Sequence, residues 1–328
     1  MHHLAAILRH DPTEPLLASG DEAIACFTRR DLLEEATGPI TPIWDLPGAK
    51  RALKGQQPDG SWKGRPLLET WRQLRHLVDQ YEMTRDHPAV AKATQYLLSC
   101  QTDEGDIRGM LGNQYAPYYT GAMLSLLIKA GFAHDPRIEK GMRWLLKMRQ
   151  DDGGWVIGSP GVVGAAGLTW RDMASLTSDR RRETMREFDR RKPFSAAGTG
   201  MVLRAFAAHP DYRRSEPTLT AARLLASKLL KRDNWSSYGH PDNWVRFQFP
   251  FWWTNLVSAL DSLSLIGLPP TEEGIRAALA WLPENQEDDG LWKESYSRIH
   301  KPAAAGKSRE ERLWITLAIC RVMKRFCF

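Results

Sequence analysis

The sequence predicts an all-α chain whose helices pair and close into a double ring. Three observations support this prediction. Apolar residues recur at helical spacing along most of the chain, several of these helices end in a turn of glutamine, acidic residues, glycine and tryptophan, and a second, more apolar helix follows each turn. A helix that is apolar all round has to be buried on several sides, so we expect these helices to line the axis and the more polar ones to lie outside.

The N-terminal residues 1–43 are expected to supply the two helices that complete the ring. The first apolar-periodic piece runs from Leu4 to Leu8 and the second from Asp21 to Glu35, with a turn containing two prolines between them. The opening residues have too short an apolar core for a secretory signal.

Four outer helices are marked by a glycine in the turn that follows each of them. These glycines are Gly60, Gly105, Gly153 and Gly290. The predicted helices before them span residues 44–57, 88–101, 136–150 and 271–286. The first two glycine-to-glycine steps are 45 and 48 residues, and the third is 137 residues, which leaves room for one more unit. Its outer helix is predicted over 217–231 and is followed by Trp235 without the glycine.

Each turn leads into an apolar helix that carries a threonine near its start. The five threonines are Thr70, Thr120, Thr199, Thr254 and Thr316. Five pairs and the two N-terminal helices give about twelve helices in all. In this arrangement the acidic-glycine turns gather at one end of the ring, where each tryptophan can pack between neighbouring hairpins.

Residues 156–194 break the period. The segment begins rich in glycine and continues with alternating charge, including three consecutive arginines at 180–182. A solvated polar insertion is one interpretation. The other is a lid over one mouth of the ring, or a docking surface for an acidic partner or for headgroups at a membrane surface. Because acidic residues are interspersed among the arginines and no recognised motif is present, nucleic acid is not an expected partner.

The composition is that of an ordinary globular protein. Hydrophobic residues make up 42% of the chain and charged residues 26%, with a net charge of +6. No apolar run is long enough to cross a membrane as a helix. The cysteines are far apart and form no Cys-x-x-Cys pair, which argues against a disulfide framework and fits the cytoplasm. They are Cys26, Cys100, Cys320 and Cys327.

The turn motif resembles the repeats of squalene-hopene cyclases, related triterpene cyclases and the β subunits of protein prenyltransferases. The matching stretches are Gln56–Trp62, Gln150–Trp155 and Gln286–Trp292, each at the end of a predicted helix. The similarity covers about residues 44–326. It implies an (α/α)6 toroid, with residues 1–328 forming one toroid domain, but the fold does not determine the activity.

Catalytic motifs that the resemblance would imply are absent from the sequence. Class II cyclases protonate an alkene with an Asp-x-Asp-Asp acid, and no such motif occurs here. The aspartate pairs at 151–152 and 288–289 lie in the structural turns, which does not suit magnesium-diphosphate chemistry. The zinc-binding Asp-x-Cys of the prenyltransferases is also missing. We therefore expect neither a metal nor another cofactor.

The second turn differs from the others and is the first candidate site. It reads Asp106-Ile107-Arg108 where the other turns reach tryptophan. A carboxylate near apolar walls has a raised pKa and can act as a general acid, which makes Asp106 a candidate acid. Alternatively, Arg108 holds Asp106 in a structural ion pair. The loop that follows adds candidate binding residues, namely Arg108 itself with Asn113, Tyr115, Tyr118 and Tyr119.

Two other carboxylates are predicted to lie on inner helices. Asp261 aligns either with buried apolar positions or with a less buried serine, depending on the residue used to align the repeats. Glu69 precedes a helix start, where the helix dipole alone would account for an acidic residue. Both are nevertheless candidate acids.

Aromatic residues are predicted to start inner helices at one end of the ring. In addition to the two tyrosines at 118 and 119, the candidate binding residues are Phe249, Phe251, Trp252, Trp253 and Trp314. Ordinary core packing is one interpretation. The other is the wall of an apolar pocket, where aromatic faces would stabilise a carbocation. The same wall would suit passive binding of a lipid or a polyprenyl chain.

Two functions stay open on this basis. One is a terpene-cyclase-like enzyme that starts cyclisation or isomerisation of an isoprenoid with an acid. The other is a non-catalytic toroid that binds a lipid, an isoprenoid or a partner protein.

Overall fold

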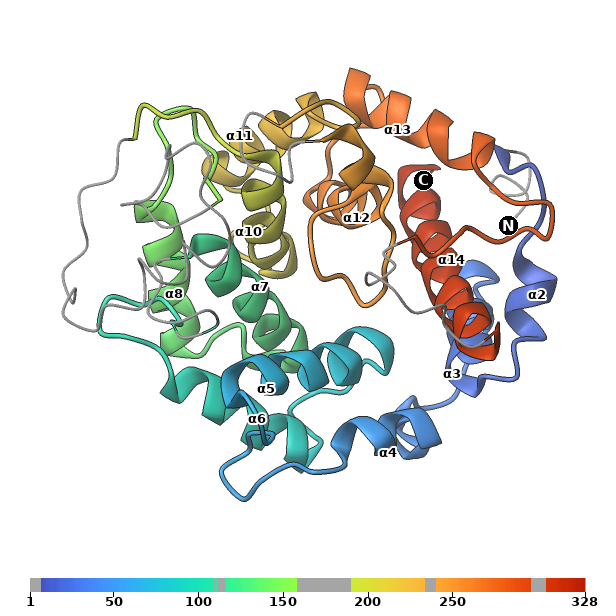
Figure 1. Cartoon of the computed structure of the whole chain (residues 1–328), viewed down its shortest axis with the longest axis horizontal. Helices are drawn as coiled ribbons and strands as arrows, with labels where there is room; N and C mark the ends of the chain where they lie inside the picture. The colour runs from blue at the N-terminus through green and yellow to red at the C-terminus, as the bar shows by residue number, and fades with distance from the viewer. Residues whose placement is uncertain are drawn as a thin grey trace.

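The computed structural model describes residues 7–108, 110, 116–157, 190–233, 240–295 and 305–327, with the side chains of 305–308 excepted. Within these ranges, paired helices follow one another around a ring (Figure 1). Inner helices alternate along the chain with outer ones. This confirms the predicted all-α (α/α)6 toroid.

Six helices of the described chain form the inner ring. They are α3 (Glu22–Phe27), α5 (Pro66–Arg75), α7 (Pro117–Leu127), α10 (Ala196–Ala208), α12 (Leu256–Ile266) and α14 (Ala305–Cys327). Three of them continue as a π-helical turn, α3 into η1 (Thr28–Leu32), α5 into η3 (His76–Gln80) and α7 into η4 (Ile128–Phe132). Six further helices lie outside them. They are α2 (Thr13–Leu17), α4 (Pro47–Leu53), α6 (Pro88–Ser99), α8 (Pro136–Lys147), α11 (Glu216–Ser227) and α13 (Glu273–Glu284).

Burial separates the two rings as the apolar pattern predicts. Every residue of α7 is buried, because this helix packs against α10 on one side and α8 on another. In α8, by contrast, the buried residues recur at helical spacing, from Ile138 through Met142 to Leu145. The apolar stripe of α8 therefore faces the inner ring and its charged face is free for solvent.

Several boundaries differ from the sequence-based expectation. The short outer helix α2 lies where the proline-containing turn was expected, and residues 1–6 lie outside the described ranges. The helix α12 begins at Leu256, so the predicted aromatic residues at 249–253 lie in the preceding loop and do not start this inner helix. Trp314 does not start an inner helix, because α14 already begins at Ala305. The Trp235 turn and most of the insertion, residues 158–189, lie outside the described residues.

The turns are held by the recurring glutamines, which explains why this residue type repeats. The side-chain amide of Gln56 donates to the carbonyl of Gly60 in its own turn and to Ala89 at the start of α6. Gln101 does the same toward Gly105 and Arg137. In these two turns the glutamine amide therefore joins the turn to the next outer helix. In the third turn Gln150 donates instead to the carbonyl of Lys192, near the end of the insertion.

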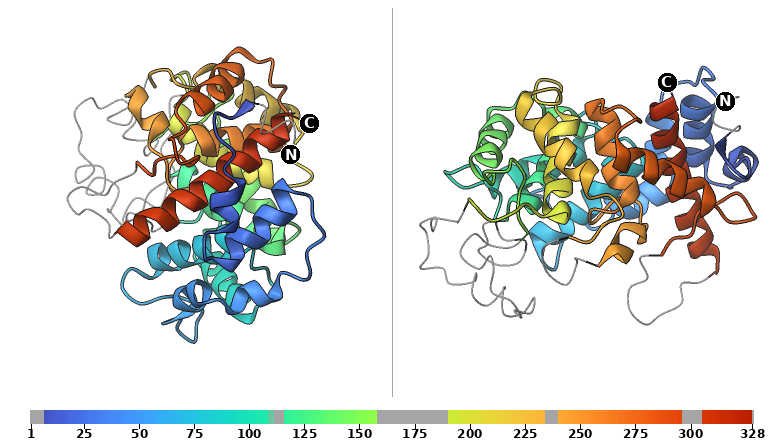
Figure 2. Two further views of the ribbon diagram at one scale, coloured as in Figure 1. Left: turned by 90° about the vertical axis from the view of Figure 1, so that its right-hand side faces the viewer. Right: turned by 90° about the horizontal axis from the view of Figure 1, so that it is seen from above.

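The last turn uses the same contact to close the ring. The amide of Gln286 donates to Gly290 and to the carbonyl of His10, and its oxygen accepts the His10 N–H at 3.0 Å. At the same junction α14 packs beside α2 and α3. The side views show this C-terminal helix, in red, alongside the blue N-terminal helices (Figure 2).

The recurring threonines have a matching structural function. Except in Thr254, whose hydroxyl donates to the carbonyl of Ala197, the threonine hydroxyl groups accept the backbone N–H of the residue at the tryptophan position of the turn. The distance is 3.2 Å for Thr70 and Trp62 and 2.9 Å for Thr199 and Trp155. Thr120 accepts in the same way from Ile107, although no tryptophan is present there. The threonine therefore fixes the turn to the start of the inner helix that follows it.

Candidate functional site

A cavity of about 780 Å³ lies at the end of the ring where the inner helices finish. We call this the cavity end, and the opposite end, where the glutamine turns gather, the turn end. The apolar part of the cavity wall is made by Ile40, Val78, Phe249, Phe251, Leu265 and Ala318. The charged part comes from η1, η3 and η4 and the residues just after them, from the middle of α12 and from the last turns of α14.

Six charged side chains on one side of the cavity form a network that we call the rim cluster. They are Arg30, Asp31, Glu34, Glu82, Arg321 and Lys324. Arg30 donates to both Asp31 and Glu82, and Arg321 also binds both carboxylates. Burial raises the pKa of Asp31, but the two guanidinium groups outweigh this effect and lower it below its usual value. The cluster ties the first inner helix to the end of α5 and to α14.

The opposite side of the cavity narrows into a small space between α5, α7, α10 and α12, which we call the inner corner. Its charged residues are Arg75, Asp79, Lys129, Arg204 and Asp261. Lys129 donates to Asp79 at 2.8 Å. Burial lowers the pKa of the Lys129 ammonium, but Asp79 and Asp261 outweigh it and raise the pKa.

Most of the predicted aromatic residues form a packed cluster and do not line this cavity. Trp252 lies 4.6 Å from Trp71 between ring centroids, and Trp253 stacks on Tyr118 at 5.8 Å. Tyr119 contacts both Trp71 and Tyr118. Tyr118 and Tyr119 are almost fully buried. We call these five rings the aromatic cluster; its tyrosines open α7 and its tryptophans at 252 and 253 lie in the loop before α12.

Phe249 and Phe251 are the predicted aromatic residues that do line the cavity. The two rings are perpendicular, with centroids 5.2 Å apart. Behind them, Trp314 is buried in α14 and stacks on Phe249 at 5.9 Å. Trp314 therefore supports the wall from behind.

The three candidate acids lie in three different environments. Asp106 is fully buried in the second turn, where Arg108 donates to it from Nε at 2.6 Å and Thr102 donates to its other oxygen. The structure thus contains the ion pair between Asp106 and Arg108 that was one of the two interpretations. This turn lies at the turn end and does not line the cavity.

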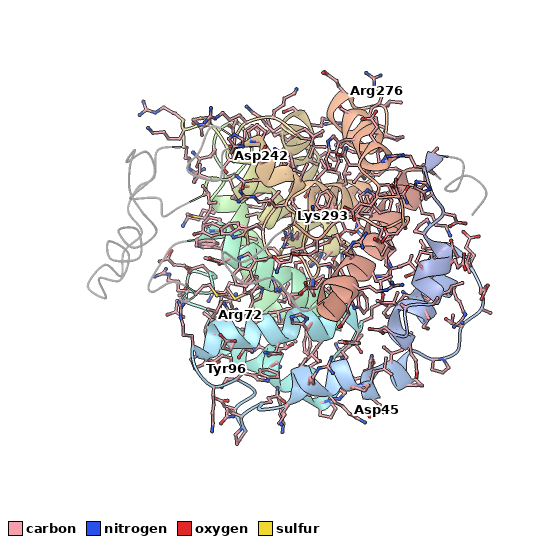
Figure 3. All side chains as sticks on the ribbon, turned by 45° about the vertical axis from the view of Figure 1, so that its right-hand side comes forward. Asp45, Arg72, Tyr96, Asp242, Arg276 and Lys293 are labelled. Atoms are coloured by element: carbon pink, nitrogen blue, oxygen red, sulfur yellow. The ribbon has the colours of Figure 1, made fainter. Side chains whose placement is uncertain are left out.

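The other two candidate acids, Glu69 and Asp261, also lie in different parts of the ring. Glu69, near the start of α5, pairs with Arg72 at 2.6 Å and borders a surface groove beside Trp62. Figure 3 shows Arg72 on α5. Asp261, in α12, lines the cavity and pairs with Arg325 of α14. Asp261 is therefore the candidate acid that the structure brings to the cavity. The predicted binding residues Asn113 and Tyr115 lie outside the described residues.

Sequence reasoning missed three cations of the inner corner, although a signal was present. Arg204 is the single charged residue in the apolar helix α10, and Lys129 ends the apolar run of α7 in η4. Arg75 is buried in α5 with 4% of its surface exposed. A charged residue within an apolar inner helix has to face a polar partner or a cavity, and this criterion would have found them.

Comparisons with known proteins agree with the repeats. Residues 69–160 match the family model of the squalene-hopene cyclase C-terminal domain. The resemblance to the terpenoid cyclases is confirmed. A probable squalene–hopene cyclase of Sinorhizobium fredii is 38% identical over 87 residues, which are 26% of this chain and 13% of that protein. The squalene–hopene cyclase of Zymomonas mobilis is 31% identical over 120 residues, 31% of this chain and 18% of that protein. The matches thus span less than a fifth of these relatives.

The solved structures that match the chain are more distant in sequence. A protein from Actinoplanes shares 14% identity over 87% of each chain, with a TM-score of 0.44. A variant of the type II terpene cyclase MstE from Scytonema, solved with geranylgeranyl dihydroxybenzoate, shares 14% identity. The match covers 96% of this chain and 86% of that one, with a TM-score of 0.44. Across the described part of the present chain, none of the helices combines the length and apolar character that a membrane span requires.

Proposed function

We propose that the cavity binds an isoprenoid or a similar long apolar molecule, and that the chain acts as a binding module without protonating its ligand. The observation that carries the proposal is the pairing of the carboxylates in the cavity wall. All five of those described form an ion pair with arginine or lysine: Asp31, Glu34, Asp79, Glu82 and Asp261. A general acid must carry its proton near neutral pH, whereas a neighbouring cation favours the ionised form of a carboxylate.

The size and wall of the cavity support an apolar ligand. Its volume of about 780 Å³ is in the range of small-molecule sites in proteins. Phe249, Phe251 and Ala318 offer apolar surface from two inner-ring segments, and the charged groups are mostly paired with one another. The relatives that match part of the chain are squalene–hopene cyclases, whose name refers to an isoprenoid substrate.

Binding can be tested by filling the cavity. Geranylgeraniol and squalene would be titrated into the protein while its tryptophan fluorescence is followed. In Ala318→Trp the new ring occupies the cavity, so the affinity is expected to fall at least about tenfold. Ala277→Trp, on the exposed face of α13, is the matched control and should bind like the wild type. Equal binding by Ala318→Trp and the wild type would contradict the proposal.

Acid-initiated cyclisation or isomerisation is the second candidate, and one observation favours it. Asp261 lines the cavity together with Phe251, so a carboxyl group that could supply a proton and an aromatic ring that could stabilise a carbocation border the same space. For this chemistry Arg325 would have to release Asp261. Incubation with squalene, followed by mass spectrometry of the products, separates the two functions. Unchanged squalene is the expected result, and a cyclised product that disappears in Asp261→Asn would favour the enzyme.

A further inference from the structure

The charges around the cavity are unevenly distributed. The rim cluster is balanced, since three cations face three carboxylates. In the inner corner, positive charges outnumber negative charges when Arg325, the partner of Asp261, is counted with it. Among the described residues its cations are Arg75, Lys129, Arg204 and Arg325, and its carboxylates are Asp79 and Asp261. The inner corner therefore carries an excess of positive charge.

Arg204 is the main source of this excess. Its guanidinium donates to three backbone carbonyls, those of Phe251 and Trp252 from Nη1 and that of Trp253 from Nη2 at 2.7 Å. Its Nε is buried and has no hydrogen-bond acceptor. No carboxylate of the described chain lies within salt-bridge distance of it. Carbonyl oxygens satisfy hydrogen bonds but leave the net charge in place.

Arg204 remains a cation despite its burial. Burial lowers the pKa of its guanidinium to about 10, which still leaves it protonated at neutral pH. Arg75 lies nearby, donates to the same carbonyl of Phe251 at 3.3 Å, and stacks over the rings of Trp71 and Trp252. Two buried guanidinium groups thus converge behind Phe251, whose side chain lines the cavity. Asp79 and Asp261 stabilise the Arg204 charge in part, but they are already paired with Lys129 and Arg325. A buried cation that is only partly neutralised is unfavourable, and a bound anion would compensate for it.

We propose that the ligand of this cavity carries an anionic head, a carboxylate or a phosphate, and that the head lies in the cavity at the mouth of the inner corner, where Lys129 borders both spaces and Arg204 lines the corner behind it. Lys129 is the more accessible of the two, with 34% of its side chain exposed, so its ammonium can contact the head directly. The apolar chain would then extend along Phe249 and Ala318 toward the rim cluster. This inference rests on the proposed function, because it specifies the head of the same ligand.

The alternative is that Arg204 has a purely structural role, and the test has to distinguish that role from recognition of an anion. The three carbonyls bound by Arg204 belong to the loop before α12, which carries Phe251 and two tryptophans of the aromatic cluster, so Arg204 also holds this loop in place. Arg204→Lys keeps the positive charge but cannot reach three carbonyls with one planar group. Arg204→Gln removes the charge. A structural role predicts that both variants lose stability alike, whereas charge recognition predicts that they differ in ligand preference.

The experiment compares ligands that share one tail and differ in the head. Geranylgeranyl phosphate, geranylgeranoic acid and geranylgeraniol would be titrated into the wild type by calorimetry, with inorganic phosphate as a separate arm. We expect both anionic ligands to bind at least about tenfold more tightly than the alcohol. The preference should persist in Arg204→Lys and shrink to less than about threefold in Arg204→Gln. Arg143→Gln, an exposed arginine of α8, is the control and should leave the preference unchanged.

The outcomes separate this inference from the proposed function. If no ligand with the tail binds, the proposed function fails. If the alcohol binds as tightly as the two anions, the proposed function stands and the anionic head is wrong. If inorganic phosphate binds as tightly as the lipid phosphate, the site recognises a free anion and not the head of a lipid. The wild-type comparison decides these cases even if Arg204→Gln does not fold.

Discussion

At the turn end the ring is held by hydrogen bonds from glutamine and threonine side chains to the backbone, whereas at the cavity end the inner helices finish in ion pairs between side chains. Gln56, Gln101 and Gln286 each bind two carbonyl groups in the same geometry. The rim cluster has no such repetition, because its six residues come only from the ends of η1 and η3 and from α14, at positions that do not correspond between the repeats. The turn end therefore repeats one local solution, and the cavity end is particular to this chain.

This difference shows where function can reside in a repeat fold. A turn whose side chains bind its own backbone has little freedom to accept a ligand. Even the second turn, which lacks tryptophan, uses Asp106 and Arg108 to satisfy each other. At the cavity end, ion pairs and apolar groups surround open volume, so a ligand can compete for partners there.

The largest effect is expected from Gly60→Ala at the turn end. Gly60 has φ of +90°, and an added Cβ would lie 2.3 Å from the carbonyl oxygen of Lys92. Backbone strain and this clash together should lower the free energy of unfolding by about 2–4 kcal/mol in urea denaturation. Gly267→Ala is the matched control, because Gly267 has φ of +92° but no heavy atom within 4 Å of the added Cβ. Equal losses in the two variants would show that the close approach to α6 contributes nothing.

Ring closure should be the next most sensitive feature. Gln286→Ala leaves the backbone groups of His10 and the carbonyl of Gly290 without their partner, which is expected to cost about 1–3 kcal/mol of unfolding free energy. Gln57→Ala removes only an exposed bond to Gly55 and should cost less than about 0.5 kcal/mol. If thermal denaturation gave the same midpoint for both variants, the junction between the chain ends would not be stabilised by this glutamine.

The two ends of the ring also differ in how much of their structure could be predicted from the sequence. The glutamine, glycine and threonine positions were visible because each repeats at a fixed place relative to the helices. The cavity end depends on contacts between helices far apart in the chain, such as Arg30 with Glu82 or Asp261 with Arg325. No local pattern marks such pairs, so the sequence could not indicate which carboxylates are neutralised.

The aromatic residues show the same limit within one stretch. Composition marked the loop before α12 as rich in rings, but it could not separate the residues that pack together from those that face the cavity. Trp252 and Trp253 turn toward Trp71 and Tyr118, while Phe251, the immediate neighbour of Trp252, lines the cavity. Irregular backbone has no fixed periodicity that would assign neighbouring residues to different faces. Only the folded structure therefore shows which rings face the cavity.

Lowering the pH should disrupt the ion pairs of the cavity end before it affects the hydrogen bonds between uncharged groups at the turn end. Because the pKa of Asp31 is lowered in the folded chain, its contribution is present above the usual aspartate pKa and is lost as the pH falls through the folded value. We expect Asp31→Asn to lose on the order of 1 kcal/mol at pH 7, and this difference from the wild type to vanish in strong acid. Asp45→Asn, which removes an exposed pair with Lys50, is the control and should differ little from the wild type at any pH. A difference that stays constant with pH would mean that Asp31 acts through packing and not through its charge.

The smallest effect is expected from Glu69→Gln, which tests whether the turn end takes part in binding at all. Glu69 pairs with Arg72 one helical turn away and lies on the opposite side of the ring from the cavity wall. Partly exposed pairs of this spacing contribute about 0.5 kcal/mol or less, so the urea midpoint should change little. Affinity for geranylgeraniol should be unchanged, because the residue does not line the cavity. A loss of affinity without a loss of stability would instead place the ligand at the groove beside Trp62, and the proposed separation between a structural turn end and a binding cavity end would be wrong.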